Sequence, residues 1–374
     1  MVAGGAAIAR DAEGRVVFVA GALPGERVRV TIESEHRGYV TGRLVEVLEP
    51  SAARVDPPCP ELARGCGACQ WQHIDVAAQR DLKRDIVLDA LTRIGKVESP
   101  ATTPTVELPA WSFRTTIRAD VKDGRAGFRR ARSHSMVAVD DCLVAHPLLV
   151  PLLTEARYPK AAEVLLRCGS RTGERLAVPS PARGRILAPS DVRRDFMHEE
   201  AAGRRWRISP ASFFQTRPDG VDALADIVVG AADDLGAPTT ALDLYCGVGL
   251  FAGVLAERGW SVTAVESESS AVGDARVNLR GLDARVVTAD VTKWSPPGAD
   301  LVIADPSRAG LGRKGVEVVH AAGARRLVLV SCDAASLGRD AALLRDAGYA
   351  ITSCTPVDMF PHTFHVEVVT VFDR

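Results

Sequence analysis

The sequence has no excess of charge of either sign, no long apolar run and no basic N-terminal lead. Its 46 Lys and Arg nearly balance 47 Asp and Glu, giving a formal net charge of −1. A protein that is basic throughout is therefore excluded, and any binding of nucleic acid must come from a local patch. Since we find neither a membrane-spanning stretch nor a signal-peptide pattern, we expect a cytoplasmic protein without membrane contact, and a monomer.

Cysteine is also scarce, with eight residues in a chain of 374. So few cysteines in so long a chain do not make a secreted disulfide scaffold, and their spacing is better interpreted as metal or catalytic chemistry. The length itself predicts two or three domains.

The first segment, residues 1–56, alternates apolar and polar residues in short runs such as RVVFVAG and ERVRVTIESE. This pattern predicts strands joined by tight turns, and together they predict a small β-barrel. Its charges nearly cancel, so composition leaves open whether the barrel is a structural module or a platform for nucleic acid.

The second segment, residues 57–205, begins with a cysteine cluster and a predicted helix from the Asp75 cap to Gly95. Residues 111–135 then hold seven Arg and Lys against two Asp, with aromatic residues between them and a KDG turn. Such a hairpin suits phosphate contacts and base stacking. A charged hairpin that only faces solvent is a competing interpretation of the same pattern. The candidate RNA-binding residues are Arg114, Arg118, Arg125, Phe128, Arg129, Arg130 and Arg132.

The third segment, residues 206–374, alternates apolar strands with helical stretches. This order predicts an α/β domain with a parallel sheet covered on both faces. Only a short connection separates the last two predicted strands, so they should form an antiparallel hairpin at the edge of the sheet.

A glycine-rich turn follows the first strand of this domain. Asp243 opens the turn, Gly247 and Gly249 follow it, and Glu266 ends the next strand. Glycines let the backbone turn tightly beneath a nucleotide-like ligand, and the acidic residue is placed to accept ribose hydroxyls, as in dinucleotide sites. The extra carboxylates of Asp243 and Asp290 are costly beside a diphosphate but not beside a sulfonium, which favours S-adenosylmethionine over NAD.

Two further groups, Asp305 and the thiol of Cys332, follow later strands of the same sheet, and a third, Glu367, lies between two valines in FHVEVVTVF. A thiolate that adds to C6 of a pyrimidine makes C5 able to accept a methyl group, and a base must then remove the C5 proton. Cys332 is the candidate nucleophile, Glu367 the candidate base, and Asp305 a group that orients the uracil or the cofactor. We expect the surroundings to activate the thiol. Strand alternation alone also allows Glu367 to face water.

At these residues the chain resembles the RNA uracil-C5 methyltransferase family, through DLYCGVGLF, DPSRAG, VSCDAASL, MFPHTFHVE and SFFQT. The resemblance implies a class I, Rossmann-like methyltransferase domain, with Cys332 as nucleophile and Glu367 as base. Leu250 and Asp333-Ala334 depart from the family pattern, which puts the local cofactor contacts in doubt. The cofactor-binding residues that it implies are Gln215, Tyr245, Glu266, Asp290 and Asp305.

Four cysteines form a separate candidate site, whose spacing suits zinc or an iron–sulfur cluster. The family resemblance favours a [4Fe-4S] cluster in an α+β central domain, and it extends to an N-terminal TRAM module with an OB-like barrel. It implies methylation of uridine C5 in structured RNA, with 23S rRNA favoured. A tRNA uridine, an inactive RNA-docking protein and an NAD-dependent dehydrogenase are the alternatives. The predicted ligands are Cys59, Cys66, Cys69 and Cys142.

Overall fold

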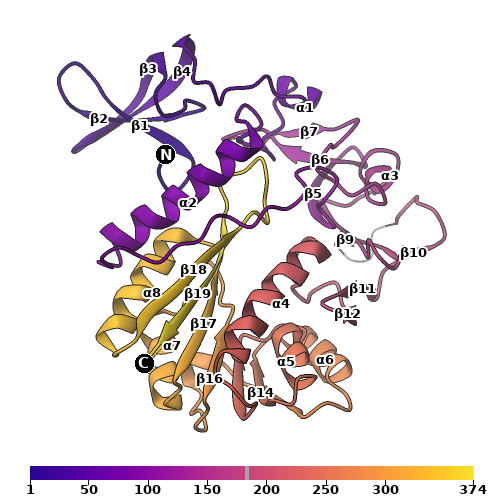
Figure 1. Ribbon diagram of the computed structural model, residues 1–374. Helices are drawn as coiled ribbons and strands as arrows, with labels where there is room; N and C mark the ends of the chain where they lie inside the picture. Colours follow the sequence, from indigo (N-terminus) through magenta and orange to yellow (C-terminus); the bar gives the residue numbers. More distant parts are fainter. Residues whose placement is uncertain (182–184) are drawn as a thin grey trace.

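The computed structural model describes residues 1–181 and 185–374. Its N-terminal module is a four-stranded sheet in the order β1-β2-β4-β3, seen at the upper left of Figure 1. Alternate apolar side chains, among them Val17, Val19 and Val40, point to one side and form a small core of their own. The strands are β1 (Ala6–Arg10), β2 (Val16–Ala20), β3 (Arg27–His36) and β4 (Tyr39–Glu49).

The central segment contains a six-stranded sheet in the order β10-β9-β8-β5-β6-β7. The predicted hairpin is confirmed, because Asp123 and Gly124 both have positive φ, as a tight two-residue turn requires. The elements are α1 (Pro60–Ala63), β5 (Thr116–Lys122), β6 (Arg125–Arg129), β7 (Met136–Ala138), α3 (Val150–Thr154), β8 (Glu163–Cys168), β9 (Arg175–Ser180) and β10 (Val192–Arg193).

The C-terminal segment holds a seven-stranded sheet in the order β15-β14-β13-β16-β17-β19-β18. Five strands are parallel, and β19 runs antiparallel to both of its neighbours, which confirms the predicted edge hairpin. The strands are β13 (Thr240–Leu244), β14 (Ser261–Glu266), β15 (Ala284–Thr288), β16 (Leu301–Ala304), β17 (Arg326–Ser331), β18 (Ala350–Val357) and β19 (Glu367–Asp373).

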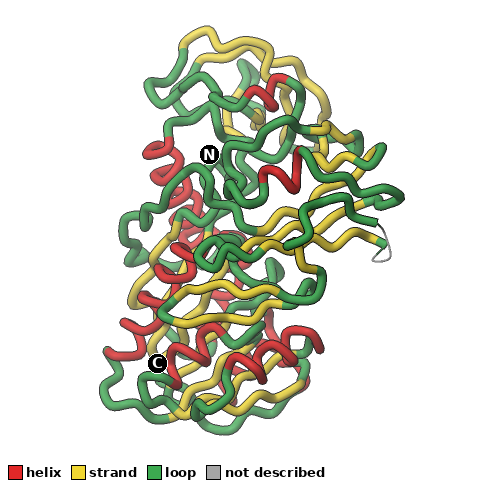
Figure 2. Tube along the Cα trace, turned by 90° about the vertical axis from the view of Figure 1, so that its right-hand side faces the viewer, coloured by secondary structure: helices red, strands yellow, loops and turns green. Residues whose placement is uncertain are grey.

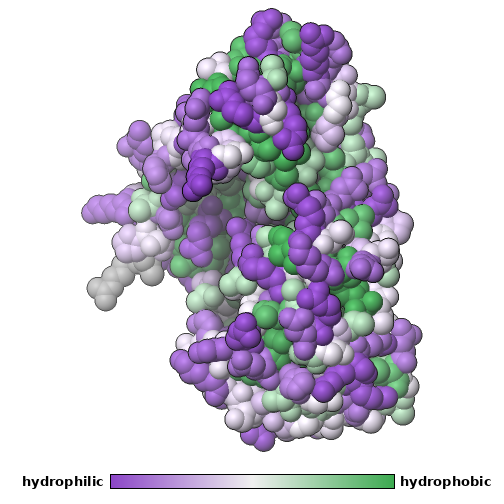
Figure 3. Space-filling model, turned by 90° about the vertical axis from the view of Figure 1, so that its left-hand side faces the viewer, coloured by the Kyte–Doolittle hydropathy of each residue, from purple (hydrophilic) through white to green (hydrophobic). Residues whose placement is uncertain are grey.

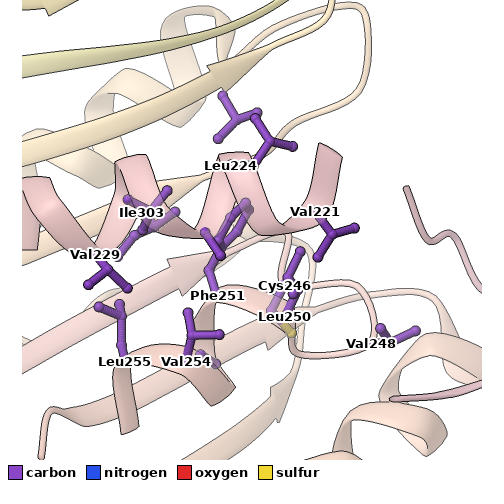
Figure 4. Close-up of a cluster of buried hydrophobic side chains, with 14 of the residues drawn as sticks. Val221, Leu224, Val229, Cys246, Val248, Leu250, Phe251, Val254, Leu255 and Ile303 are labelled. Atoms are coloured by element: carbon purple, nitrogen blue, oxygen red, sulfur yellow. The ribbon is translucent and has the colours of Figure 1, made fainter. Parts of the chain in front are cut away.

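Helices cover both faces of this sheet. One apolar core lies under α4, α5 and part of α6, and the close-up in Figure 4 shows side chains of α4 meeting those of α5 and of Ile303. A second core lies on the other face, under α7 and α8. The helices are α4 (Pro218–Asp233), α5 (Leu250–Ala256), α6 (Ser269–Asn278), the 3-10 turn η1 (Val291–Lys293), α7 (Gly312–Ala322) and α8 (Ala334–Asp346).

The helix α2 (Val76–Arg93) begins at the predicted Asp75 cap, whose carboxylate accepts the amides of Ala77 and Ala78. Although its sequence lies in the central segment, α2 packs against α8 and joins the core of the C-terminal sheet. The chain that follows also reaches this sheet, since Thr102 and Val106 bridge to β18. Part of the central segment therefore packs on the C-terminal domain, where α2 lies beside α8 and β18 (Figure 1), and Figure 2 shows the helices and strands of the whole chain from the side.

A short hairpin of β11 (Met197–Ala201) and β12 (Arg204–Ile208) connects the segments. Its buried side chains, such as Trp206, belong to the core of α4 and α5. The predicted domain boundary at residue 206 thus falls inside β12. No helix in the described part of the chain is long and apolar enough to cross a membrane. Hydrophilic side chains cover most of the face in Figure 3, with apolar patches between them.

Candidate active site

The site lies at the edge of the sheet where the five parallel strands end. Parallel strands present their carboxyl ends at one edge, and ligands of open α/β sheets bind there. Asp305 directly follows β16, and Cys332 directly follows β17, which is the next strand in the sheet. The predicted convergence of these two groups on one edge is confirmed.

Glu367 reaches the same edge because β19 runs in the opposite direction. In the β17–β19 ladder Ser331 pairs with Val368, so the next step of this register sets Cys332 opposite Glu367. Directly opposed residues of an antiparallel pair lie on the same side of the sheet. Glu367 is only 3% exposed, and the alternative in which it faces water is wrong.

The three groups influence one another electrostatically. Burial raises the pKa of Glu367 well above its usual range, and the charge of Asp305 raises it further. Burial also raises the pKa of Asp305 to about 7. A hydrogen bond of 3.3 Å from Gln215 Nε2 to Asp305 Oδ2 acts to lower this pKa. Raised carboxyl pKa values of this kind are typical of groups that exchange protons at functional sites.

The expected activation of the thiol is not found. Burial, followed by the charges of Glu367 and Asp305, raises the pKa of Cys332 to about 12, although the charge of Arg308 and a backbone hydrogen bond lower it. The physical reason is that burial disfavours the charged thiolate, and that the neighbouring carboxylates repel it. Proton removal from Cys332 is therefore a demanding step in the unliganded enzyme.

The glycine turn has the shape that a nucleotide-like ligand needs. Gly247 and Gly249 both have positive φ, at 55° and 91°, where side chains other than glycine are strained. No atom lies within 3.8 Å of the position that a Cβ of Gly247 would occupy, whereas one on Gly249 would meet Leu279 at 3.0 Å. Gly247 is thus open to a ligand, and Gly249 is required for packing.

Carboxylates surround this turn. Asp243 is fully buried, accepts the Ala252 amide at 2.8 Å through Oδ2, and has no hydrogen-bond partner for Oδ1 among the described residues. Burial raises the pKa of Asp243 to about 8. Glu266 accepts the Gly247 amide at 3.0 Å, and Asp290 caps η1 through the Thr292 amide.

The carboxylates of Glu266 and Asp290 at this rim fit a positively charged cofactor and disfavour a diphosphate, because negative charge near phosphate is repulsive. The unpartnered oxygen of Asp243 further leaves room for a donor from a ligand. Tyr245 enters the turn with a φ of 64°, and its hydroxyl lies next to Gly315 of α7. The residues present therefore fit S-adenosylmethionine.

Sequence reasoning missed the residues that hold the cofactor segment together. Asn278 donates to Val248 O of the glycine turn at 3.0 Å and accepts the Arg207 amide of β12 at 2.8 Å. The buried carboxylate of Asp274 accepts the hydroxyl of Ser212, in the SFFQT segment, at 2.6 Å. Phe213 in that segment is 61% exposed and suited to stacking on a flat ligand. These contacts join distant parts of the chain, so local spacing gave no signal for them.

The four predicted metal ligands come together around one small cavity, which Phe128 and Val139 also line. Burial raises the pKa values of Cys66, Cys69 and Cys142. Among the residues that the structure describes, however, no three Cys, His, Asp or Glu side chains are arranged to hold a metal ion. The donor set is thus gathered in one place without forming a compact site for a single ion.

The basic hairpin is less free than the sequence suggested. Its arginines contact acidic or carbonyl groups: Arg125 pairs with Asp140, Arg129 with Asp120, and Arg132 with Glu33 of β3. Arg130 donates to the Arg64 carbonyl. Among the described residues, Arg118 has only a 3.9 Å ion pair with Glu163. The charge of Arg114 acts on the Cys69 and Cys142 thiols and lowers their pKa values.

The prediction that Phe128 contacts RNA needs correction. Its side chain is 9% exposed and lies in the core of the central segment, because strand alternation in β6 turns it inward. Phe113 is buried in the same core. Trp111 is the aromatic residue of this stretch that stays partly exposed, with one face stacked on His362 at 3.9 Å between ring centres.

Comparison with known proteins agrees with this geometry. Residues 3–45 match the TRAM domain family. A protein of Streptomyces avermitilis described as an uncharacterized RNA methyltransferase is 37% identical, over 99% of this chain and 95% of its own. The 23S rRNA (uracil(1939)-C(5))-methyltransferase RlmD of Pectobacterium atrosepticum is 31% identical, over 98% and 91%.

Among solved structures, the tRNA (uracil-54, C5)-methyltransferase of Pyrococcus abyssi, in complex with S-adenosyl-L-homocysteine, aligns with a TM-score of 0.74. It is 24% identical and covers 98% of this chain and 99% of its own. Fold and site together define a class I, S-adenosylmethionine-dependent methyltransferase with an N-terminal TRAM domain. The chain belongs to the RNA uracil-C5 methyltransferase family, and it is an RNA methyltransferase.

Proposed function

We propose that this enzyme methylates C5 of a uridine in 23S rRNA through a covalent bond between Cys332 Sγ and uracil C6. The observation that carries the proposal is the strand register that sets Cys332 opposite the buried Glu367, with Asp305 at the end of the neighbouring strand. The 31% identity to RlmD supports rRNA as the substrate class. A duplex hides C5 and C6 within the base stack, so the target uridine is flipped out to reach the thiol.

In this mechanism the thiolate of Cys332 forms the S–C6 bond, and the electrons of the C5–C6 double bond move toward the C4 carbonyl. S-adenosylmethionine, when bound, supplies the electrophilic methyl group that C5 takes up. Glu367 then removes the C5 proton, the C5–C6 double bond reforms, and the bond from C6 to Cys332 breaks with return of the thiolate. The thiolate is thereby regenerated, so the net proton released in each turnover comes from C5 through Glu367.

The cofactor roles proposed for this chain rest on position and charge. Gly247 leaves space for the cofactor to approach the backbone of the turn. Glu266 and Asp290 provide hydrogen-bond acceptors at the ends of β14 and β15. The side chain of Gln215 is hydrogen-bonded to Asp305. Asp243 contributes a buried acceptor beside the turn. Asp305, which the Gln215 amide contacts, orients the uracil edge or the cofactor.

We also propose that Cys59, Cys66, Cys69 and Cys142 hold a [4Fe-4S] cluster. Zinc would need its thiolates about 2.3 Å from one ion, whereas a cubane cluster binds each thiolate to a different iron and so spreads them more widely. Support comes from the four thiols that line one cavity. Anaerobically purified protein should be brown and should absorb in the visible region; colourless protein with bound zinc would contradict the cluster.

The decisive experiment offers labelled S-adenosylmethionine with unmodified 23S rRNA and, separately, unmodified tRNA, and identifies the methylated nucleoside by mass spectrometry. We expect 5-methyluridine in 23S rRNA alone. Label in tRNA alone would move the substrate class to tRNA. Bound cofactor without label in either RNA would favour a docking protein, and tight binding of NAD without binding of S-adenosylmethionine would favour a dehydrogenase.

The covalent step has its own test. Cys332→Ala should abolish both turnover and the capture of RNA that contains 5-fluorouridine, because no sulfur remains to add to C6. Glu367→Gln should accumulate methylated RNA bound to protein, because elimination needs the base. An active Cys332→Ala enzyme would refute the nucleophile assignment, and normal product release by Glu367→Gln would move the base elsewhere.

A further inference from the structure

The loop that carries Glu367 into the site is held from outside the methyltransferase sheet. It spans residues 358–366, between the end of β18 at Val357 and the start of β19 at Glu367. Val357 also pairs directly with Glu367. Strand pairing thus fixes the backbone of Glu367 on one side, and the loop, which ends directly before Glu367, fixes how the chain enters β19.

Three side chains of α2 bind this loop, and one of them, Arg80, donates from Nε to Asp358 Oδ2 at 3.3 Å. The ammonium of Lys83 donates to Asp358 Oδ1 at 2.6 Å and to the carbonyl of Phe360 at 2.8 Å. One turn earlier, Gln79 Oε1 accepts the backbone amide of His362 at 2.7 Å. Lys83, Gln79 and Asp358 all have 0% exposure, so solvent does not weaken these contacts.

His362 is the second anchor point of the loop. It has a φ of 64°, an unfavourable conformation for a residue with a side chain, and its surroundings must impose it. Burial lowers the pKa of His362 to about 4, so the ring is neutral. It can then accept from Gln79 Nε2 at Nδ1, 3.3 Å away, and donate from Nε2 to the Ala110 carbonyl at 3.1 Å.

The burial of Lys83 argues for a role other than stability. A buried ion pair contributes little net stability, because desolvation of both charges offsets their attraction, but it favours one geometry over others. Burial indeed lowers the pKa of Lys83, while Asp358 acts to keep it charged. The pair fixes the first residue of the loop, and Gln79 fixes its middle.

We propose that Gln79 and Lys83 are positioning residues that set the β18–β19 loop, and through it the carboxyl of Glu367, for removal of the C5 proton. The proposal rests on the proposed function, in which Glu367 is the base. Neither residue touches the reacting atoms. Their loss should slow elimination from the covalent adduct more than it weakens binding of RNA or S-adenosylmethionine.

The test compares Gln79→Leu and the charge-free pair Lys83→Met/Asp358→Asn with a control and a reference. The double variant removes both charges of the ion pair, and Arg80, which also contacts Asp358, keeps its ion pair with Glu107. Ile86→Ala is the control, since Ile86 lies buried on the same helix in the core shared with α8 and destabilises without entering the loop network. Glu367→Gln is the reference for a missing base. Unmodified 23S rRNA is the substrate.

We expect kcat to fall about 10- to 100-fold in the α2 variants, as misplacement of a catalytic group does, with KM for S-adenosylmethionine nearly unchanged. Methylated RNA bound to protein should accumulate as in Glu367→Gln, and should not in Ile86→Ala at an equal loss of melting temperature. If the α2 variants behave like Ile86→Ala while Glu367→Gln traps the adduct, the positioning role is overturned and the function stands. If Glu367→Gln itself turns over normally, the base assignment fails and the positioning role falls with it.

Discussion

The groups proposed to react, Cys332 and Glu367, and their neighbour Asp305 are held in protonation states that oppose the proposed reaction. The Cys332 thiol has a pKa of about 12, and Glu367 and Asp305 have raised pKa values because burial disfavours their charges. Each carboxylate also raises the pKa of the thiol. Glu367, the proposed base, can therefore accept a proton only after it has lost its own at higher pH. Ionisation of the Cys332 thiol is costly.

A pH dependence follows for Asp305→Asn. In the natural enzyme kcat/KM should rise as pH rises between about pH 6 and pH 10, since raised pKa values keep the groups protonated on the acid side. Replacing Asp305 removes one negative charge, which lowers the pKa values of Glu367 and Cys332. The rising limb should therefore move to lower pH, although the maximal rate falls because the hydrogen bond with Gln215 is altered. The measurement is kcat/KM across this range.

Gln215→Met serves as the matched control, because it removes the same hydrogen bond and keeps the Asp305 carboxyl, whose pKa rises once the hydrogen bond is lost. That variant should lower the rate without moving the rising limb to lower pH. A limb that stays in place in Asp305→Asn, or that moves to higher pH, would contradict the charge coupling between Asp305 and the reacting pair.

Among the elements, α2 and α8 approach each other unusually closely. A Cβ at Gly338 of α8 would lie 2.7 Å from the Ala90 carbonyl and 2.9 Å from Ile94 Cβ, and one at Gly95 would lie 3.2 Å from the Gly338 carbonyl. Glycine at both places lets the helix backbones come together. This contact brings α2, with Gln79 and Lys83, to the loop that carries Glu367.

We therefore expect Gly338→Ala to destabilise the protein by about 1–3 kcal/mol, because the new methyl group overpacks a helix contact. Gly273→Ala in α6 is the control, since a Cβ there meets nothing within 4 Å. That change should be neutral or stabilising by roughly 0.5–1 kcal/mol, because alanine loses less entropy on folding than glycine. Denaturant unfolding of both variants gives the comparison. Equal stability of the two would show that the helices can separate without loss.

The existence of α2 could be predicted from the Asp75 cap and Gly95, but its packing partner could not. Its apolar side chains, such as Ile86 and Leu91, indicate burial but do not indicate which sheet they face.

The strand ends that carry Asp305 and Cys332 could also be predicted, since local apolar runs end there. That Cys332 stands opposite Glu367 depends on the β17–β19 register, which pairs residues far apart in sequence. The inward turn of Phe128 was hidden for a similar reason, because an aromatic among arginines fits a core strand as well as an RNA surface.

On the scale of the whole molecule, a net charge of −1 leaves RNA binding to a limited surface. The exposed arginines of the hairpin and of its following loop lie on the central segment, and Arg132 also reaches Glu33 of the TRAM domain at 2.9 Å. That pair is exposed enough for a phosphate to compete for the guanidinium. Arg118, with only a 3.9 Å partner, is free to turn toward RNA. We therefore assign the phosphate contacts first to these two residues.

Arg118→Ala/Arg132→Ala should weaken binding of 23S rRNA and reduce the slope of log K against log salt by about 2, because each lost phosphate contact removes about one released counterion. Binding of S-adenosylmethionine should not change. The control is Arg258→Ala/Arg325→Ala, which removes two arginines next to the amino ends of β14 and β17, at the sheet edge opposite the site. A control that weakens binding equally, or a hairpin variant with an unchanged salt slope, would place the RNA elsewhere. The measurement is RNA affinity at several salt concentrations, and it separates a surface that contacts phosphate from one whose arginines only pair with neighbouring carboxylates.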